Sequence, residues 1–221
     1  MLDIVITRYN EPISIMKPLL DSIALQRGID FADVSVTIVN DGKENASDLD
    51  GIGFYPFAIH TTAIAHGGIS AARNHGIDST SDDYICFCDC DDSWLDLYAL
   101  HAIFSACQEE PDMISSSFVE EVRLEDGTMT ITRHDKDPTF IHGKVYKRSF
   151  LVEKNIRFDT RLRYHEDGAF NTVCLMLTTP KYIETPLYLW CWREGSVCRN
   201  ESFVLKSYDQ VMMQRVAVAE E

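Results

Sequence analysis

Long apolar segments are missing from this sequence of 221 residues, and no run approaches the roughly 20 apolar residues that a membrane-spanning helix needs. Residues 1–4 also lack the basic region and the cleavage site of a secretory signal. We therefore expect no transmembrane segment and a cytoplasmic location, with peripheral binding to a membrane left open. Internal repeats, low-complexity tracts and Gly/Ser-rich linkers are missing too, which predicts a single domain over residues 1–221.

Positive charge is also scarce, because 20 Lys and Arg residues stand against 35 Asp and Glu residues, for a net charge of −15. Broad binding to nucleic acid needs basic groups that neutralise phosphates, so this composition argues against nucleic acid as a partner. Hydrophobic residues make up 45% of the chain, which is enough to bury a substantial core without disulfide bonds.

None of the seven cysteines stands at the two-residue spacing that is typical of zinc ligands. Cys86, Cys88 and Cys90 alternate, so a strand would place all three on one face. A metal site made of three thiolates is one interpretation of this pattern. The favoured interpretation is a set of reduced, partly buried cysteines in a cytosolic protein.

The first half of the chain alternates strand and helix patterns. Short apolar runs predict strands at residues 4–6, 34–39, 54–59 and 84–88. Helical spacing predicts helices over 13–24 and 69–77, and Ser93 is expected to cap a third helix that runs to about Gln108. Strands that alternate with helices form βαβ units, so we predict an α/β fold with a mixed, mostly parallel sheet flanked by helices.

The second half has a different pattern. Asp126-Gly127 stands between two strand-like stretches, 118–122 and 128–132, and predicts a β-hairpin. Helices are expected over 147–154 and 166–177, and short strands at 182–183 and 187–192. We therefore divide the chain into an open sheet over 1–110, a smaller mixed portion over 111–200 and a final helix over 201–221.

Three carboxylates follow directly after the apolar strand at 84–88, in the sequence Asp89-Cys90-Asp91-Asp92. Carboxylates this close repel one another unless a cation or solvent screens them, and their hard oxygens suit Mg²⁺ or Mn²⁺. Ligands of open α/β sheets bind beyond the carboxyl ends of the strands, which is where this cluster lies. A solvated acidic turn in which Asp92 or Ser93 caps the next helix is an equally good interpretation.

A glycine pair precedes the helix expected at 69–77, in the segment Gly67-Gly68-Ile69-Ser70-Ala71-Ala72-Arg73-Asn74. Glycines let the backbone approach a ligand, a helix start favours anions, and Arg73 offers a charged fork suited to pyrophosphate. The glycine spacing is not that of the dinucleotide fingerprint. Taken alone, the segment predicts a loop-to-helix junction with Arg73 on the surface.

Taken in order, several segments of this chain resemble the family 2 glycosyltransferases with the GT-A fold. These segments are Ile4 to Pro12, Asn40-Asp41-Gly42, Ala72-Arg73-Asn74, Asp89 to Trp94, His142 to Leu151, Glu166-Asp167, and Tyr188 to Ser196. The resemblance covers residues 2–200, nearly the whole chain. It implies an inverting, metal-dependent hexosyltransferase that takes a sugar from a nucleotide diphosphate, with a UDP-sugar as the expected donor.

The resemblance also implies roles for single residues. Tyr9 would stack on the nucleotide base, Asp41 would accept a hydrogen bond from uracil, and Arg73 would lie near the diphosphate. Asp89 would contact the ribose or the waters of the metal, and Asp91 would bind Mn²⁺ or Mg²⁺ directly. The full donor-binding set is Thr7, Tyr9, Asn10, Glu11, Asp41, Arg73, Asp89, Cys90 and Arg193, and the metal ligands are Asp91 and Asp89. One departure is Thr7-Arg8, because many members have Pro-Thr or Pro-Ser before Tyr-Asn.

By the same resemblance, Asp167 would be the general base that takes the proton of an acceptor hydroxyl. Glu166 is the alternative, since adjacent residues of a helix do not face the same way. Arg193 lies in a loop that could close over the donor and reach a phosphate. Residues 1–110 would form the nucleotide-sugar half and 111–200 the acceptor and catalytic half. Whether the acceptor is a glycan, a lipid-linked molecule or a protein is left open.

Some features have a second, plainer interpretation. Residues 143–163 carry a net charge of +5 and could steer an anionic ligand, although a solvated helix and loop is favoured. His165 could bind a metal or orient the acceptor, but a polar neighbour of the acids is favoured. Trp190 and Trp192 could stack a sugar, but core packing is the more frequent use of such a pair.

Two other functions fit parts of the pattern. A sugar-phosphate nucleotidyltransferase also combines acidic residues with magnesium, but it usually has a Gly-rich, basic loop where this chain has Arg8-Tyr9-Asn10-Glu11-Pro12. A catalytically silent module that binds a sugar or a nucleotide would not need acids at positions 89, 91 and 167.

Overall fold

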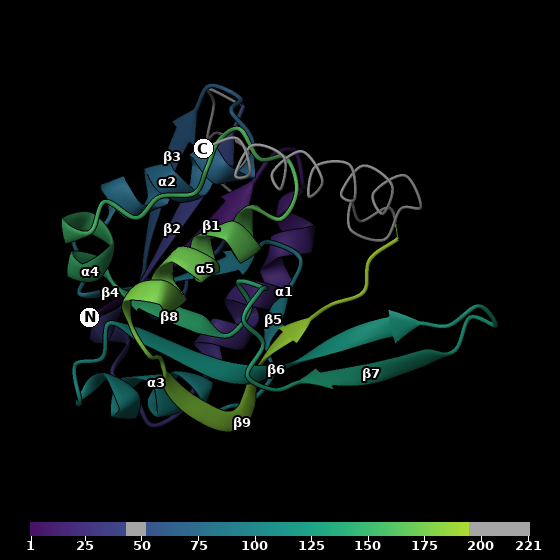
Figure 1. Cartoon of the computed structure of the whole chain (residues 1–221). Helices are drawn as coiled ribbons and strands as arrows, with labels where there is room; N and C mark the ends of the chain where they lie inside the picture. The colour runs from purple at the N-terminus through teal and green to yellow at the C-terminus, as the bar shows by residue number, and fades with distance from the viewer. Residues whose placement is uncertain (43–51, 195–221) are drawn as a thin grey trace, which may run out of the picture.

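The computed structural model describes residues 1–42 and 52–194 and shows a mixed α/β fold built on one sheet (Figure 1). The strands follow the order β3-β2-β1-β4-β8-β6-β9-β5, and β7 pairs with β6 beside this path. The elements of the first half are β1 (Leu2–Arg8), α1 (Ile13–Ala24), a 3₁₀ turn (Phe31–Asp33), β2 (Val34–Asp41), β3 (Ala58–Ile64), α2 (Ile69–Ser79) and β4 (Tyr84–Asp89). The α/β class predicted from the sequence is confirmed.

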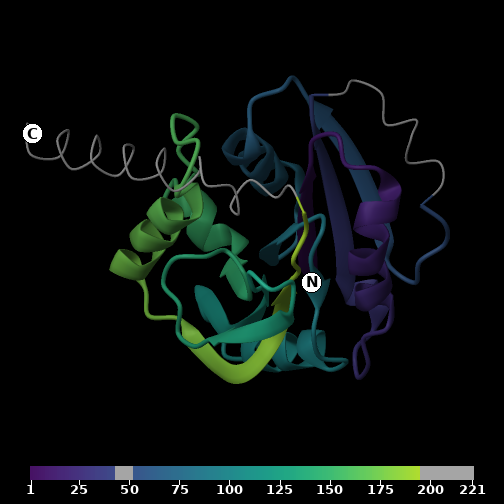
Figure 2. The same cartoon turned by 90° about the vertical axis from the view of Figure 1, so that its right-hand side faces the viewer.

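The four strands of this first half are parallel, with β1 paired to β2 and β4, and β2 paired to β3. Successive side chains of β1 point to opposite faces of the sheet, so neighbouring residues pack against different helices. Ile4 and Ile6 belong to the core cluster that contains α1, whereas Val5 belongs to the cluster that contains residues of α2 and α5. The side view shows α1 on the outer face of these strands (Figure 2). Two buried layers therefore enclose β1 and β4 and fix where their carboxyl ends lie.

The second half continues the same sheet. Its elements are β5 (Ser93–Trp94), α3 (Ala99–Cys107), β6 (Met113–Arg123), β7 (Met129–His134), β8 (Lys144–Lys147), α4 (Arg148–Glu153), α5 (Glu166–Leu177) and β9 (Lys181–Trp190). Strand β8 is antiparallel to both β4 and β6, while β9 runs parallel to β6. The hairpin predicted around Asp126-Gly127 is β6–β7, which extends away from the body of the protein (Figure 1).

Two predicted elements are misplaced. The third strand was expected at 54–59, but β3 spans Ala58–Ile64 and Phe54 is fully exposed. This strand lies at the edge of the sheet and contains His60, Thr61 and Thr62, so it lacks the apolar run that marks buried strands. The helix expected from Ser93 begins only at Ala99.

Residues 93–94 form strand β5 instead of a helix start, because they pair with β9. Ser93 is paired with Leu189 and Trp94 with Tyr188, and the Trp94 side chain is buried in the core. The two short strands expected at 182–183 and 187–192 are one strand, β9, with an irregular register against Ser116 and Ser117. Helix α5 matches the predicted bounds of 166–177. The helix expected over 201–221 lies outside the described residues, and the division at residues 110 and 200 stays a prediction.

Candidate functional site

A cleft of about 230 Å³ opens at the carboxyl ends of β1, β2 and β4. Parallel strands end at the same edge of a sheet, so residues far apart in sequence meet there. The cleft is lined by Thr7, Arg8, Tyr9, Glu11, Asp41, Ile69, Ala72, Asp89, Cys90, Asp91 and Arg193. The structure thus brings together most of the donor-binding residues proposed from the sequence, and both proposed metal ligands. Asn10, Arg73, Glu166 and Asp167 do not line this cleft.

One end of the cleft is built by Tyr9 and the loop before α2. Tyr9 is 47% exposed, and its ring centroid lies 4.4 Å from that of His66. The buried Asp41 carboxylate accepts hydrogen bonds from the backbone N–H groups of Gly67 (2.7 Å) and Gly68 (2.9 Å), and its Oδ2 lies 2.9 Å from His66 Nδ1. Asp41 therefore holds the glycine pair in place as well as facing the cleft. Sequence reasoning missed His66, although it directly precedes that pair.

The turn after β1 is closed by Glu11. Its carboxylate accepts hydrogen bonds from the backbone N–H groups of Tyr9 (2.8 Å) and Asn10 (3.2 Å). Arg8 is buried, and its guanidinium donates to the Asn40 side chain at 3.2 Å and to the backbone carbonyl of Glu11. Asn10 is exposed. The segment from Thr7 to Glu11 is therefore fixed at both its ends before any ligand arrives.

Arg73 differs from the surface residue that the sequence predicts. It is only 2% exposed, and its guanidinium donates to Asp89 Oδ1 and to Glu166 Oε1, both at 3.0 Å. The next residue, Asn74, exchanges two hydrogen bonds with the backbone of Phe158, each at 2.8 Å. A sequence pattern shows that Arg73 lies near a helix start, but it cannot show that Glu166, at the start of α5, reaches it from the second half. Arg73 joins the acidic end of β4 to the first turn of α5.

The two candidate bases begin α5 but have different surroundings. Glu166 is held by Arg73, whereas Asp167 accepts a hydrogen bond from the backbone N–H of Gly168 at 2.8 Å. Within residues 1–42 and 52–194, Asp167 forms no ion pair. Burial raises the pKa of the Asp167 carboxyl above its ordinary value, and the positive charge of Arg73 opposes that rise. Burial raises the pKa of the Glu166 carboxyl too, so the two acids differ in pairing: among the described residues Arg73 pairs with Glu166, and no cation pairs with Asp167.

Lys144 lies buried beneath this helix. Its ammonium group donates to the backbone carbonyl of Phe140 and lies 3.8 Å from Asp137 Oδ1. Burial lowers the pKa of Lys144 to about 8, and the negative charges of Asp137 and Asp167 act against that shift. The sequence placed Lys144 in a basic segment that steers ligands or lies in solvent, and its burial fits neither interpretation. The segment's other cations include three that form ion pairs: Lys147 with Glu110, Arg157 with Asp78 and Arg161 with Asp159.

The three acids Asp89, Asp91 and Asp92 at the end of β4 lie in two different environments. Asp89 and Asp91 face the cleft, where Arg193 Nε lies 3.2 Å from Asp91 Oδ2. Burial and the neighbouring Asp89 charge raise the pKa of the Asp91 carboxyl, so a cation would be favoured there. Asp92 is only 1% exposed and points away from solvent. The alternative interpretation, in which Asp92 or Ser93 caps the next helix, is wrong because that helix, α3, begins only at Ala99.

Residues that suit a divalent ion are therefore present. Hard carboxylate oxygens of Asp89 and Asp91 line the cleft, as Mg²⁺ or Mn²⁺ requires. A second grouping in the described part of the chain consists of Asp89, Asp92 and His142, whose ligand atoms lie within 4.8 Å of one another. No cysteine belongs to it. Cys86, Cys88 and Cys90 are buried, and burial raises the pKa of the Cys88 and Cys90 thiols, as expected of core residues.

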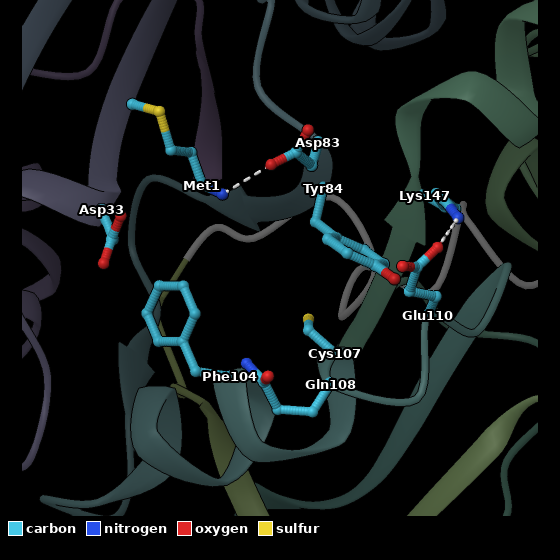
Figure 3. A pocket seen from close by; sticks show the side chains of 9 residues that line it. All are labelled: Met1, Asp33, Asp83, Tyr84, Phe104, Cys107, Gln108, Glu110 and Lys147. Atoms are coloured by element: carbon cyan, nitrogen blue, oxygen red, sulfur yellow. Dashed lines mark hydrogen bonds and ion pairs between the residues drawn. The ribbon is translucent and has the colours of Figure 1, made fainter.

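A second cavity, of about 430 Å³, lies near the amino ends of β1, β2 and β4 (Figure 3). It is lined by Met1, Asp33, Asp83, Tyr84, Phe104, Cys107, Gln108, Glu110 and Lys147. Met1 is paired with Asp83 and Lys147 with Glu110, as the dashed lines in Figure 3 show. This cavity contains none of the predicted site residues, and it lies away from the carboxyl ends of the strands, where ligands of such sheets bind. We therefore assign the site to the smaller cleft.

The remaining predicted features are accounted for as follows. Trp190 packs against Phe140 and His142 with ring centroids 5.1 and 4.9 Å away, which confirms the core interpretation for this tryptophan. Trp192 lies beside the β6–β7 hairpin, with the Arg123 guanidinium 5.0 Å from its ring. His165 precedes α5 in a left-handed conformation, with φ of 60°. The loop residues Gly195 and Ser196 lie outside the described part of the chain.

Comparison with known proteins identifies relatives of this fold and sequence. The uncharacterized glycosyltransferase EpsJ of Bacillus subtilis (strain 168) is 26% identical over 199 residues, with 77% of this chain and 55% of EpsJ covered. The crystal structure of S. aureus TarS 1–349 in complex with UDP-GlcNAc superposes with a TM-score of 0.69 at 16% identity, covering 88% of this chain and 59% of TarS. The mannosyltransferase PcManGT from Pyrobaculum calidifontis, in complex with GDP-Man and Mn²⁺, gives 0.64 at 17% identity, covering 89% and 59%.

The chain spans about half the length of the curated relatives that it matches. In the part of the chain that the structure describes, no helix is both long and apolar enough to cross a membrane. The structural likeness confirms the GT-A fold expected from the sequence. The model of the glycosyl transferase family 2 matches residues 3–170, which is more than half of the chain. This protein belongs to glycosyl transferase family 2.

Proposed function

We propose that this chain transfers a sugar from a UDP-sugar to an acceptor hydroxyl with inversion at the anomeric carbon. The observation that carries the proposal is the cleft at the ends of β1, β2 and β4, which gathers Tyr9, Asp41, Asp89, Asp91 and Arg193. The Tyr9 ring and the buried Asp41 carboxylate suit the base of a nucleotide. Asp89, Asp91 and Arg193 suit its ribose and its phosphates. The UDP and UDP-GlcNAc complexes of TarS support this class of donor.

The nucleotide would enter with its base between Tyr9 and Asp41. The Tyr9 ring offers an exposed face, and base–aromatic stacking is worth about 1–3 kcal/mol per base. Each Asp41 oxygen already accepts at least one hydrogen bond, but a carboxylate has about four acceptor sites, so it can also accept from an N–H group of uracil. At the other end, Arg193 would meet the diphosphate.

In the transfer step, Asp167 would take the proton of the acceptor hydroxyl as its oxygen bonds to the anomeric carbon. The bond between that carbon and the diphosphate breaks, and the diphosphate leaves with its electron pair. Asp89 and Asp91 would hold a Mn²⁺ or Mg²⁺ ion, whose positive charge stabilises the leaving diphosphate. The ion in PcManGT supports Mn²⁺, and Mg²⁺ is kept as the alternative. Glu166 would keep Arg73 in place rather than act as the base.

The experiment that tests this proposal is a panel of nucleotide sugars with the full chain. UDP-, GDP- and TDP-linked hexoses are each incubated with Mn²⁺ or Mg²⁺, and release of the nucleoside diphosphate and thermal stabilisation are measured. We expect release and stabilisation with UDP-sugars, lost in a variant with Asp91→Asn. If pyrophosphate instead forms from UTP and a sugar phosphate, the chain is a nucleotidyltransferase. Stabilisation by UDP-sugars without any turnover, with a range of acceptors, would indicate a silent binding module.

A further inference from the structure

The third acid of Asp89-Cys90-Asp91-Asp92 connects two strands below the cleft. Asp92 Oδ2 accepts a hydrogen bond from the Tyr188 hydroxyl at 2.7 Å, and Asp92 Oδ1 accepts one from the backbone N–H of Cys191 at 2.9 Å. The Tyr188 hydroxyl in turn accepts from the backbone N–H of Asp89 at 3.3 Å. The carboxyl end of β4 is thus bonded to the carboxyl end of β9 at three points, and Asp92 takes part in two.

Residues 191–193, which follow β9, carry Arg193 into the cleft. Arg193 Nε lies 3.2 Å from Asp91 Oδ2, and its terminal nitrogen lies 3.9 Å from Glu11 Oε1. Only one residue, Trp192, separates Arg193 from Cys191, whose backbone N–H donates to Asp92. The intervening Trp192 donates its own backbone N–H to Glu121 at 2.9 Å, so two anchors fix this short segment, one between β4 and β5 and one on β6.

Asp92 is an unfavourable residue to bury for packing alone. Its side chain is 1% exposed, and among the described residues no Lys or Arg forms an ion pair with it. The basic side chain beside it is His142, whose Nδ1 lies 3.7 Å away, and burial lowers the pKa of His142 to about 4, so this ring is neutral near pH 7. A buried carboxylate without a permanent positive partner destabilises a fold. Its two hydrogen bonds nevertheless fix the backbone that presents Arg193.

We infer that Asp92 is a positioning residue, which holds Arg193 beside Asp91 at the phosphate end of the cleft through its bonds to Cys191 and Tyr188. The inference rests on the proposed function, because it assumes that a nucleoside diphosphate binds in this cleft. Arg193 is a long side chain on a segment without regular structure, so its contact with a phosphate depends on where its backbone is held. Asp92 itself does not line the cleft.

The test measures binding of UDP and of uridine, with Mn²⁺ present, to the full chain. In a variant with Asp92→Asn, the side chain keeps its size and one acceptor oxygen for Cys191, but its NH₂ group cannot accept from Tyr188. We expect UDP to bind about tenfold more weakly and uridine to bind unchanged, because only UDP has the diphosphate that Arg193 meets. Should Asp92→Asn fail to fold, Tyr188→Phe removes the same bond from the other side, together with the bond from the Asp89 N–H, and we expect the same pattern.

A matched control is present on the same strand. The Tyr182 hydroxyl also binds a carboxylate, that of Asp135, and accepts a backbone N–H, that of Lys136, but it lies away from Arg193. We expect Tyr182→Phe to leave the affinities for UDP and uridine unchanged. A loss equal to that of Tyr188→Phe would overturn the inference, because any hydrogen-bonded hydroxyl of β9 would then matter equally.

A double-mutant cycle separates positioning from a general loss of structure. If Asp92 acts through Arg193, Asp92→Asn should have little further effect on UDP affinity in a chain that already carries Arg193→Gln. A full tenfold loss in that background, or an equal loss for uridine, overturns the inference. Should the unchanged chain bind neither UDP nor uridine, the proposed function fails instead, so the two failures give different results.

Discussion

Arg73 carries a permanent positive charge into a position that solvent hardly reaches, and two carboxylates receive it. We predict that Arg73→Gln lowers the free energy of unfolding by about 3–5 kcal/mol, because Asp89 and Glu166 would remain without their cation. Urea unfolding followed by circular dichroism measures this loss. Arg157→Gln is the matched control, since Arg157 pairs with the exposed Asp78 and should cost about 1 kcal/mol or less. Equal losses would mean that Arg73 is no more important than a surface ion pair.

Kinetics and stability should distinguish the roles of Asp167 and Glu166, the two adjacent acids of α5. We predict that Asp167→Asn lowers kcat by about 10² to 10⁴ with the affinity for UDP unchanged, because the amide cannot take the acceptor's proton. Glu166→Gln should instead lower the free energy of unfolding, since Arg73 loses one of its partners. Steady-state kinetics and urea unfolding of both variants decide between the roles. The reverse result, an active Asp167→Asn and an inactive Glu166→Gln, would exchange the assignments.

The surroundings of Asp167 also predict the pH dependence of the reaction. Burial raises the pKa of this carboxyl above its ordinary value of about 3.9, and a general base acts only when it is deprotonated. The rate should therefore fall as the pH is lowered through the raised pKa, with a midpoint above that of an exposed aspartate. Profiles of kcat against pH measure this limb, and the residual activity of Asp167→Asn should lack it. An acid limb that persists in that variant would belong to another group.

At the scale of elements, the contact of α2 with β1 is close because residue 76 is a glycine. A Cβ atom at Gly76 would lie 2.4 Å from Val5 Cγ1, so any larger residue must push the helix from the sheet. We predict that Gly76→Ala lowers the free energy of unfolding by about 1–3 kcal/mol and weakens UDP binding, because Arg73 and the glycine pair move with α2. Thermal unfolding and calorimetry with UDP measure the two effects.

The compensating change tests that explanation directly. Val5→Ala removes the methyl groups that a Cβ at residue 76 would meet, so Gly76→Ala should cost less in that background. Ser79→Ala, on the exposed end of the same helix, should change stability by no more than about 0.5 kcal/mol. Additive losses from the first pair would show that the contact with Val5 is not the cause.

The elements that sequence predicts well are those with a clear apolar pattern, either a continuous apolar run or a helical period. Residues 4–6 and 84–88 read as strands because β1 and β4 are buried almost throughout, and 166–177 reads as a helix with its bounds correct. The edge strand β3 has no such apolar pattern, and β5 forms only because β9, about 95 residues later, pairs with it. Local pattern carries no information about such a partner.

The residues of the candidate site also fall into those that the sequence could predict and those that it could not. Asp41, Asp89 and Asp91 could be predicted because each ends or directly follows a buried strand, and a motif marks them. The burial of Arg73 and Asp92 could not, because it depends on α5 and on β9, which fold over the first half from distant parts of the chain. Periodicity in sequence therefore locates the residues of the cleft but not the bonds that join the two halves beneath it.

For the molecule as a whole, the net charge of −15 repels an anionic donor at long range. Near the cleft, the guanidinium of Arg73 is already occupied by two carboxylates, and that of Arg193 faces Asp91 and Glu11. Within the described part of the chain, few positive charges near the cleft are thus left to meet a diphosphate. A divalent ion at Asp89 and Asp91 would supply the missing charge, so we expect the donor and the ion to bind together.

This coupling predicts how the stability of the whole chain responds to ligand. UDP and Mn²⁺ together, at about 100 times the dissociation constant, should stabilise the fold by about 2.7 kcal/mol, which raises Tm by about 5–10 °C for a chain of this size. UDP with a chelator should give much less. Asp91→Asn should abolish the effect of Mn²⁺, whereas Asp78→Asn, on the exposed end of α2, should retain it. Differential scanning calorimetry measures each shift against the same variant without ligand, which removes any effect of the lost bond between Asp91 and Arg193. Equal stabilisation by UDP with Mn²⁺ and with the chelator would show that the acidic pair holds no ion needed for the donor.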